Sequence, residues 1–102
     1  MQIDKLRGRE LDQLFEGILT LKNVEECYRF FDDVATVNEI QALAQRMDVA
    51  RMLREGHTYQ RIEEETNAST ATISRVKRSL NYGSDAYEMV FRRLNGEEEE
   101  SE

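Results

Sequence analysis

Small, hydroxylated and basic side chains are concentrated between Asn67 and Gly83, a stretch that contains no Asp or Glu. Hydroxyl and guanidinium groups can bond base edges and phosphate oxygens, and small side chains let a helix approach the bases closely. Seven such residues fall on the polar side of one predicted helix: Thr70, Ala71, Thr72, Ser74, Arg75, Lys77 and Arg78. The stretch therefore predicts a nucleic-acid contact.

Two short helices must position this group of side chains. The spacing of apolar residues predicts a helix from about Tyr59 to Thr66 and a second from about Thr70 to Leu80, with a turn between them. Thr58 and Ser69 can cap the two helices with their hydroxyls. Asn67 tolerates the left-handed backbone conformation that a sharp turn needs. The pattern is typical of a helix-turn-helix, whose second helix enters the major groove of DNA.

Each residue of the motif has an expected contact on DNA. The residues expected closest to the bases begin the second helix: Thr70, Ala71 and Thr72. Ser74 and Arg75 come next, and Arg75 can read a guanine or clamp a phosphate. The residues expected to contact the DNA backbone come from both helices: Gln60, Arg61, Ser69 through its backbone amide, Lys77 and Arg78.

The run NASTATISRVKRSL, residues 67–80, resembles the turn and recognition helix of the tryptophan-repressor family. The nearest resemblance is to bacterial relatives of the YerC/YecD type. It extends from about Leu11 to Leu94, and its specific part is the stretch from Thr58 to Asn81. The resemblance implies an all-α, six-helix fold, an intertwined homodimer, and a sequence-specific DNA-binding regulator that represses transcription. Such a dimer would bind a near-palindrome whose half-sites are about 34 Å apart between centres.

The same resemblance indicates where a corepressor would bind. In the tryptophan repressor the indole lies between an Arg of the central helix and an Arg of the recognition helix. Arg75 matches the second, whereas Gln45, next to Arg46, stands at the first. The following residue is Gly in the repressor and Val76 here, and a branched side chain would fill the volume that an indole needs. We therefore expect no tryptophan response and no cofactor, with a smaller corepressor left open.

The rest of the chain also predicts helices. Apolar spacing indicates four more: Asp4 to Leu21, a second beginning after Asn23, a third from Thr36 to about Arg54, and a last one capped by Ser84. Asn23 with Glu26 and Thr36 with Glu39 form capping-box patterns, and Gly56 ends the third helix. We expect one helical domain over residues 1–96, followed by a disordered acidic tail over 97–102.

The net charge of -7 is distributed unevenly along the chain. Residues 1–38 carry five Lys/Arg and eight Asp/Glu, residues 39–83 carry seven and six, and residues 84–102 carry two and seven. The acidic residues thus lie mainly in the flanks, and the predicted second helix of the motif is basic. Three basic residues bind phosphates weakly, so pairing of two chains is expected to double the contact surface.

The predicted second helix of the chain carries more large apolar side chains than one exposed face explains, among them Tyr28, Phe30 and Phe31. Either it is central to the core, or it meets another chain and supports a homodimer. Cys27 lies on this apolar face and is expected to be buried and inert.

No phosphate-binding Gly-rich loop, paired catalytic carboxylates or activated nucleophile occurs, so an enzyme is not expected. His57 has no second ligand at metal-binding spacing. No apolar segment exports or anchors the chain, which predicts a cytoplasmic protein with no membrane contact. The alternative is a helical protein-interaction module that keeps the helix-turn-helix fold. Such a module would need large apolar groups on the outer face of the second helix, where Thr72, Arg75 and Arg78 stand instead.

Overall fold

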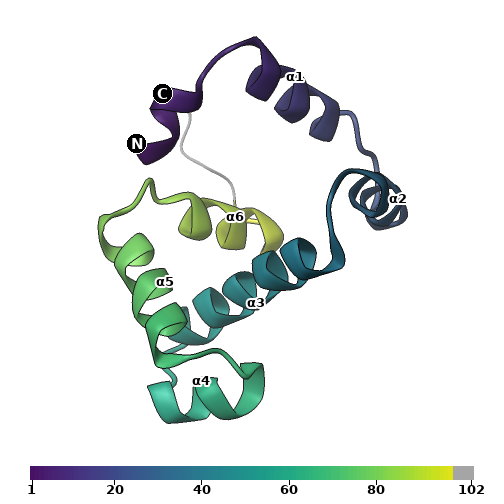
Figure 1. Ribbon diagram of the computed structural model, residues 1–102. Helices are drawn as coiled ribbons and strands as arrows, with labels where there is room; N and C mark the ends of the chain where they lie inside the picture. Colours follow the sequence, from purple (N-terminus) through teal and green to yellow (C-terminus); the bar gives the residue numbers. More distant parts are fainter. Residues whose placement is uncertain (98–102) are drawn as a thin grey trace. The chain divides into compact units, whose positions relative to one another are not determined.

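A computed structural model describes residues 1–97. The described residues form six α-helices after a short 3-10 helix, without a strand (Figure 1). In chain order the elements are η1 (Gln2–Leu6), α1 (Arg9–Ile18), α2 (Val24–Val34), α3 (Val37–Arg54), α4 (Tyr59–Thr66), α5 (Thr70–Tyr82) and α6 (Ala86–Leu94). The predicted all-α fold class is confirmed. The acidic tail predicted over residues 97–102 lies outside the described residues, apart from Glu97.

The chain divides into two compact units, Met1–Ile40 and Gln41–Glu102, and the boundary falls within α3. The first unit holds η1, α1 and α2, and the second holds most of α3 with α4, α5 and α6. The expectation of a single domain stays a prediction. No described helix is long and apolar enough to cross a lipid bilayer.

Of the two predicted capping boxes, the one at α3 is complete, whereas at α2 the Asn23 cap is present but Glu26 bonds the amide that precedes Asn23. At α2, the Asn23 side chain accepts a hydrogen bond from the Glu26 amide at 2.8 Å, and the Glu26 carboxylate accepts one from the Lys22 amide at 2.9 Å. At α3, the Glu39 carboxylate accepts from the Thr36 amide at 2.9 Å, and the Thr36 hydroxyl accepts from the Glu39 amide at 3.2 Å. These bonds satisfy amides that have no partner inside the helix.

The predicted end of α3 is also confirmed. Gly56 has a φ of +88°, a conformation that costs a residue with a side chain more than it costs glycine. Its amide donates to the Leu53 carbonyl at 3.1 Å, and the His57 amide donates to the Met52 carbonyl at 3.1 Å. This pair of bonds is the Schellman arrangement that closes a helix.

The boundaries of α1 and α6 differ from the predictions. The expected single helix from Asp4 to Leu21 is divided into η1 and α1, because Arg7 and Gly8 are extended. Glycine loses the most conformational freedom in a helix, so this is a favourable place for the break. At the other end of the chain, α6 begins after Asp85, and no side chain caps it, so the expected Ser84 cap is wrong.

The hydrophobic core lies within the second unit. Its buried residues are Val49, Ala50, Met52, Ile62, Ala68, Ile73, Val76 and Phe91. In contrast, η1, α1 and α2 contain no buried residue. The prediction that Cys27 is buried is wrong, since Cys27 is exposed. Two short helices are too small to enclose an apolar interior by themselves, which leaves the wide apolar face of α2 uncovered.

Candidate nucleic-acid interface

The turn between α4 and α5 is fixed by a local bond network. Asn67 ends α4 in the predicted left-handed conformation, with φ 60° and ψ 14°. The Thr66 hydroxyl donates to the Ile62 carbonyl at 2.7 Å and accepts from the Ala68 amide at 3.1 Å. From α3, the Gln45 side-chain amide donates to the Thr66 carbonyl at 3.1 Å. The turn is therefore held both locally and by a residue 21 positions away.

Both helices of the motif begin with the predicted hydroxyl caps. The Thr58 hydroxyl accepts from the Arg61 amide at 3.2 Å, and the Ser69 hydroxyl accepts from the Thr72 amide at 3.1 Å. The Ser69 hydroxyl also donates to the Thr72 hydroxyl oxygen at 3.1 Å. Because Thr72 accepts in that bond, its own hydroxyl proton remains free for a ligand.

The helix α5 has an inner and an outer face. Ile73 and Val76 are buried at 0% and 3% exposure, and Leu80 packs partly buried against them. Opposite them lie four exposed residues at helical spacings of three and four, which we call the α5 outer face: Ala71, Ser74, Arg75 and Arg78. The structure thus gathers on one surface four of the residues predicted to contact DNA.

The guanidinium groups of the two arginines of the α5 outer face have no hydrogen bond or ion pair with any described residue. Several other arginine side chains of the second unit are paired with carboxylates. Arg51 pairs with Asp48 at 2.8 Å, Arg61 pairs with Glu65 at 2.6 Å, and Arg54 pairs with Glu88 at 2.8 Å. The charges of Arg75 and Arg78 are therefore unneutralised within the described chain and available to an anionic ligand.

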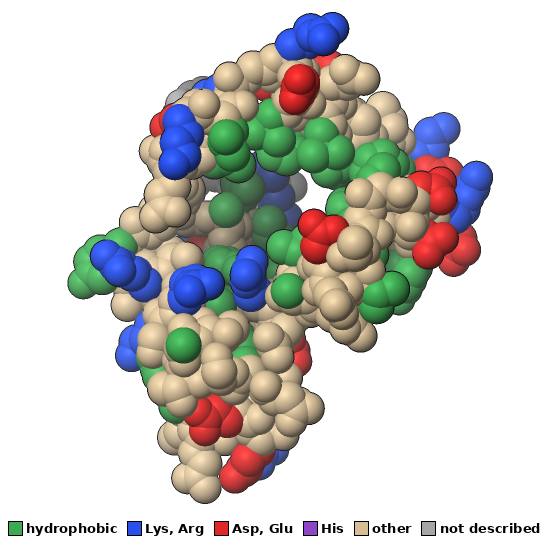
Figure 2. Space-filling view, viewed as in Figure 1, with side chains coloured by type: hydrophobic (Ala, Val, Ile, Leu, Met, Phe, Trp, Pro, Cys, Tyr) green, Lys and Arg blue, Asp and Glu red, His purple; other side chains and the backbone are tan. Residues whose placement is uncertain are grey.

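Thr70 and Lys77 lie toward α4. The Thr70 hydroxyl donates to the Glu63 carboxylate, and the Lys77 ammonium lies 5.7 Å from the centre of the Tyr59 ring. Both contacts join α4 to α5, so Thr70 already has a partner for the group that was expected to bond a base. Its predicted DNA contact remains untested. Figure 2 shows acidic side chains over α4 and basic side chains over α5.

The predicted backbone contacts of α4 are engaged with acids of the same helix. The Gln60 side-chain amide donates to the Glu64 carboxylate at 3.3 Å, and Arg61 pairs with Glu65 as described above. Contact with a phosphate would require each of these exposed side chains to exchange its partner. Exposed pairs of this kind contribute little stability, so the exchange costs little.

The residues suggested for a corepressor pocket have separate environments. Val76 is part of the core, and Gln45 holds the turn through the Thr66 carbonyl. Arg46 is partly buried in α3, and Arg75 is exposed on the α5 outer face. The side chain of Val76 is thus packed in the core, and the prediction that it excludes an indole stays a prediction.

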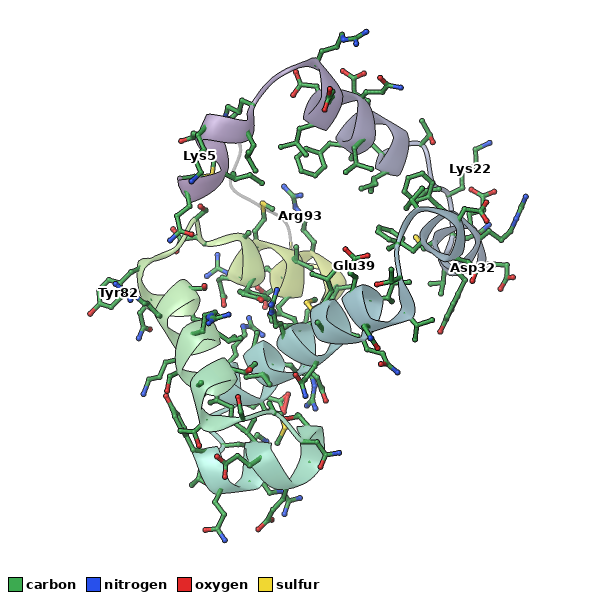
Figure 3. The ribbon with its side chains drawn as sticks, viewed as in Figure 1. Lys5, Lys22, Asp32, Glu39, Tyr82 and Arg93 are labelled. Carbon is green, nitrogen blue, oxygen red and sulfur yellow. The ribbon has the colours of Figure 1, made fainter. Side chains whose placement is uncertain are left out.

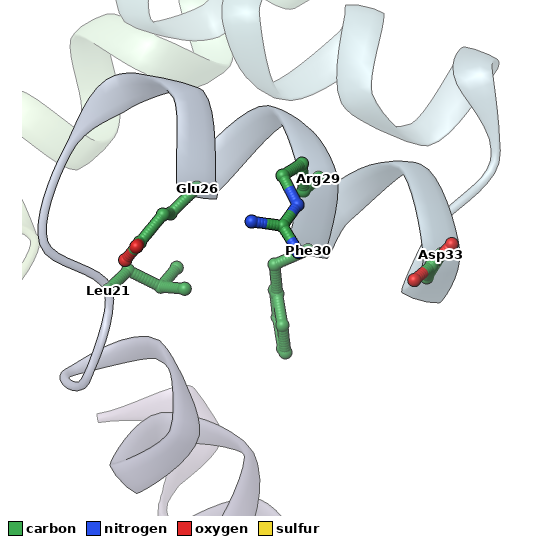
Figure 4. A pocket seen from close by; sticks show the side chains of 5 residues that line it. All are labelled: Leu21, Glu26, Arg29, Phe30 and Asp33. Carbon is green, nitrogen blue, oxygen red and sulfur yellow. The ribbon is translucent and has the colours of Figure 1, made fainter.

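Two surface hollows occur in the first unit and are lined by none of the residues of the predicted site. One, of about 350 Å³, is lined by Leu21, Glu26, Arg29, Phe30 and Asp33 (Figure 4). The other, of about 550 Å³, is lined by Glu10, Gln13, Leu14, Gly17 and Phe30. Phe30 lines both hollows. They therefore lie on the uncovered surface of the first unit, and charged side chains line most of the first hollow.

Tyr82 is an exposed residue of α5 that was not included in the predicted contacts. The helix continues past the predicted end at Leu80 to Tyr82, which is 86% exposed. Tyr82 follows Arg78 by four positions and therefore extends the α5 outer face. The same spacing that relates Ala71, Arg75 and Arg78 could have indicated it in the sequence.

The sequence and the fold were compared with known proteins. The family described as Trp repressor protein matches residues 9–95. The uncharacterized protein YerC of Bacillus subtilis (strain 168) is 73% identical over 101 residues, which are 99% of this chain and 97% of YerC.

Solved structures give the same result. The crystal structure of a candidate Trp repressor from Staphylococcus aureus has a TM-score of 0.91 and 64% identity, and the match covers 97% of this chain and 99% of that chain. A TrpR-like protein from Eubacterium eligens ATCC 27750 has a TM-score of 0.88 and 57% identity, covering 94% of this chain and 99% of that chain. The resemblance and the fold expected from the recognition-helix sequence are confirmed.

Proposed function

Because the chain belongs to the Trp repressor protein family, a family of regulators and not of enzymes, we propose that it is a helix-turn-helix transcription regulator that binds a specific DNA sequence. The observation that carries the proposal is the α5 outer face, which combines small side chains with the unpaired Arg75 and Arg78. The direction of regulation that agrees with the family is repression.

In the proposed complex, the N-terminal end of α5 enters the major groove. The Ala71 methyl group meets a thymine methyl group, and the free hydroxyl proton of Thr72 is donated to a base acceptor. Arg75 reaches a guanine or a phosphate, and Arg78 binds the DNA backbone. The cap at Ser69 and the bond from Gln45 to Thr66 hold the helix in place before DNA arrives, which lowers the ordering cost of binding.

We further propose that the DNA-binding form is a homodimer. The apolar side chains of the first unit are exposed in one chain: Leu14 is 39% exposed, Phe15 45%, and Tyr28 72%. Exposed apolar surface of this extent is typical of an interface. A second copy of the chain can cover α1 and α2 and supply a second recognition helix. The target is then a near-palindrome with half-site centres about 34 Å apart.

The proposed regulator does not respond to tryptophan. Val76 occupies core volume at 3% exposure, and the Gln45 side chain is engaged with the turn. Making room for an indole would require moving a buried branched side chain, which core packing opposes. Isothermal titration calorimetry with L-tryptophan should therefore detect no heat of binding. The titration should reach about 1 mM, the range in which a weak ligand would still bind.

The function can be tested by selecting random DNA duplexes on the purified protein at about 0.1 M salt, where phosphate contacts are still strong. The wild-type chain should enrich a near-palindromic motif. The double variant Arg75→Ala, Arg78→Ala should lose it. The double variant Lys5→Ala, Lys22→Ala removes the same charge from exposed residues of the first unit (Figure 3) and should retain the motif.

The outcomes of this selection are distinct. Loss of the motif in both double variants would show an effect of net charge and not of the α5 outer face. No enriched motif for the wild-type chain would be followed by a repeat with added amino acids, which tests for a required small ligand. If that repeat also enriches nothing, the chain is not a sequence-specific DNA-binding protein.

A further inference from the structure

Tyr82 is the last residue of α5 and is 86% exposed. Figure 3 shows its side chain projecting outward from the end of the helix. The Tyr82 side chain has no hydrogen bond or ring contact with another described residue. A large aromatic ring left in water loses the free energy that burial would provide, so a partner outside the described chain would stabilise it.

The position of Tyr82 is fixed by the residue that follows it. The Gly83 amide donates to the Ser79 carbonyl at 2.9 Å, which closes the last turn of α5. A Cβ atom on Gly83 would lie 2.3 Å from the Ser79 carbonyl oxygen, so only glycine allows this close approach. Tyr82 therefore belongs to the ordered helix and keeps its angular position relative to Arg75 and Arg78.

We propose that Tyr82 is a further DNA contact of α5, whose hydroxyl donates a hydrogen bond to a backbone phosphate at the edge of the major groove. The inference rests on the proposed function. Tyr82 follows Ala71 by eleven positions, which is roughly 16 Å along the helix axis. The major groove is about 12 Å wide, so a helix with Ala71 at the bases carries Tyr82 beyond the groove and over the backbone. Tyrosine hydroxyls are common phosphate donors.

The surroundings of Tyr82 favour DNA over a protein partner. Its sequence neighbours Asn81, Gly83 and Ser84 are small or polar and exposed, so the chain beside the ring adds no large apolar side chain. Protein interfaces instead place aromatic anchors within an apolar centre. By helical spacing, the exposed charges of α5 that share the face of Tyr82 are the cations Arg75 and Arg78, and α5 contains no acid. An anionic partner fits this combination.

The test compares Tyr82→Phe with the wild-type chain by fluorescence anisotropy, using the selected duplex and a random duplex over a range of salt concentrations. The variant keeps the ring and loses the hydroxyl. Affinity should fall roughly tenfold to a hundredfold, because a dimer carries the residue twice, and it should fall equally on both duplexes. The salt slope should stay unchanged, since a neutral donor releases no counterion. By contrast, Arg78→Ala should reduce the slope.

A matched control removes a tyrosine hydroxyl elsewhere in the second unit. Tyr87→Phe alters a partly buried ring of α6 that stacks on Phe91, and it should bind both duplexes as the wild-type chain does. Unchanged affinity of Tyr82→Phe would overturn the inference, as would a loss confined to the selected duplex. A change of oligomeric state in Tyr82→Ala by sedimentation would identify a chain contact instead. Wild-type protein that binds neither duplex would refute the proposed function itself.

Discussion

Thr72 has a structural role at the start of α5 and is also a base contact in the proposed complex. Its amide and its hydroxyl oxygen are both engaged by Ser69 at the start of α5, and its hydroxyl proton remains free. The residue is partly buried, so its orientation is set before DNA binds. A side chain held in this way can discriminate between bases, because little freedom is lost on binding.

Replacement of Thr72 by Ala should weaken binding to the preferred site by roughly 1 to 3 kcal/mol and leave binding to random DNA nearly unchanged. Thr72→Ser keeps the hydroxyl and serves as the control, with most of the affinity retained. Competition binding with the two duplexes measures the difference. Equal losses on both duplexes would show that Thr72 does not contact a base.

Among the residues that the structure describes, Glu88 has a carboxyl whose pKa is strongly lowered by its neighbours. Hydrogen bonds from Arg54, and then from Arg92, lower the pKa of the Glu88 carboxyl from 4.5 to about 2. Arg54 also lies 5.6 Å from the centre of the Phe91 ring, so this cluster joins α3 to α6. A folded-state pKa below the ordinary value means that the charged form stabilises the fold.

The contribution of Glu88 to stability should be complete above about pH 4.5 and should be lost as the pH falls toward about 2. Urea unfolding at a series of pH values can measure this loss. Glu88→Gln should be less stable than the wild-type chain at pH 7, and its stability should decrease less over this pH interval. Parallel pH profiles for the two proteins would contradict the assignment.

At the scale of the elements, α4 and α5 are joined by polar as well as apolar contacts. The Thr70 hydroxyl donates to the Glu63 carboxylate, and Lys77 lies over the Tyr59 ring. Ile62 and Ile73 are both fully buried in the same core. The angle between the two helices thus depends on contacts at the surface and in the interior, and in the proposed complex this angle sets how α5 meets DNA.

Thr70→Val preserves the shape of the side chain and removes its hydroxyl. If the hydroxyl mainly joins α5 to α4, the free energy of unfolding should fall by about 1 kcal/mol. The loss of DNA affinity should then be similar for preferred and random duplexes. A loss restricted to the preferred duplex, with stability unchanged, would instead support the base contact predicted from the sequence.

The end of α5 offers a second test at this scale. Gly83→Ala would place a methyl group 2.3 Å from the Ser79 carbonyl oxygen, and we expect a destabilisation of about 1 to 3 kcal/mol in urea unfolding. Gly17→Ala is the matched control, because a Cβ atom there has no neighbour within 4 Å and Gly17 lies inside α1. That variant should gain about 0.5 to 1 kcal/mol. Equal stability of both variants would contradict the close approach at Gly83.

At the scale of the whole molecule, the two units differ in how they are stabilised. The second unit has a buried core, whereas α1 and α2 have no buried residue. Nearly all of the apolar side chains of α2 therefore remain available to a second chain. Homodimerisation would give the first unit the burial that it lacks and would also double the number of recognition helices.

Phe30→Asn should shift the protein toward a monomer in sedimentation experiments, because Phe30 lines both hollows of the first unit. It should also weaken binding to the near-palindrome, since one chain contacts one half-site. Asp32→Asn introduces the same residue at an exposed position of α2 (Figure 3) and should remain dimeric. A wild-type chain that sediments as a monomer at micromolar concentration would contradict the proposed dimer.

The sequence alone determined those features that depend on residues three or four positions apart. The caps at Thr58 and Ser69, the left-handed Asn67 and the inner face of α5 were all predicted and are all present. Such contacts form within one helical turn, so their residue types and spacing are sufficient to identify them. The family resemblance was read from the residue types and spacing of the same stretch, and the family match over residues 9–95 confirms it.

Other features were decided only by the tertiary structure. The sequence did not show that Gln45 holds the turn, that Thr70 is bonded to Glu63, or that Cys27 is exposed. Each depends on which elements lie against one another, and local spacing contains no information about partners far along the chain. Exposure of α2 is the clearest case, because its wide apolar face predicted contact without indicating whether the contacting helix would come from the same chain, and the structure buries none of its residues.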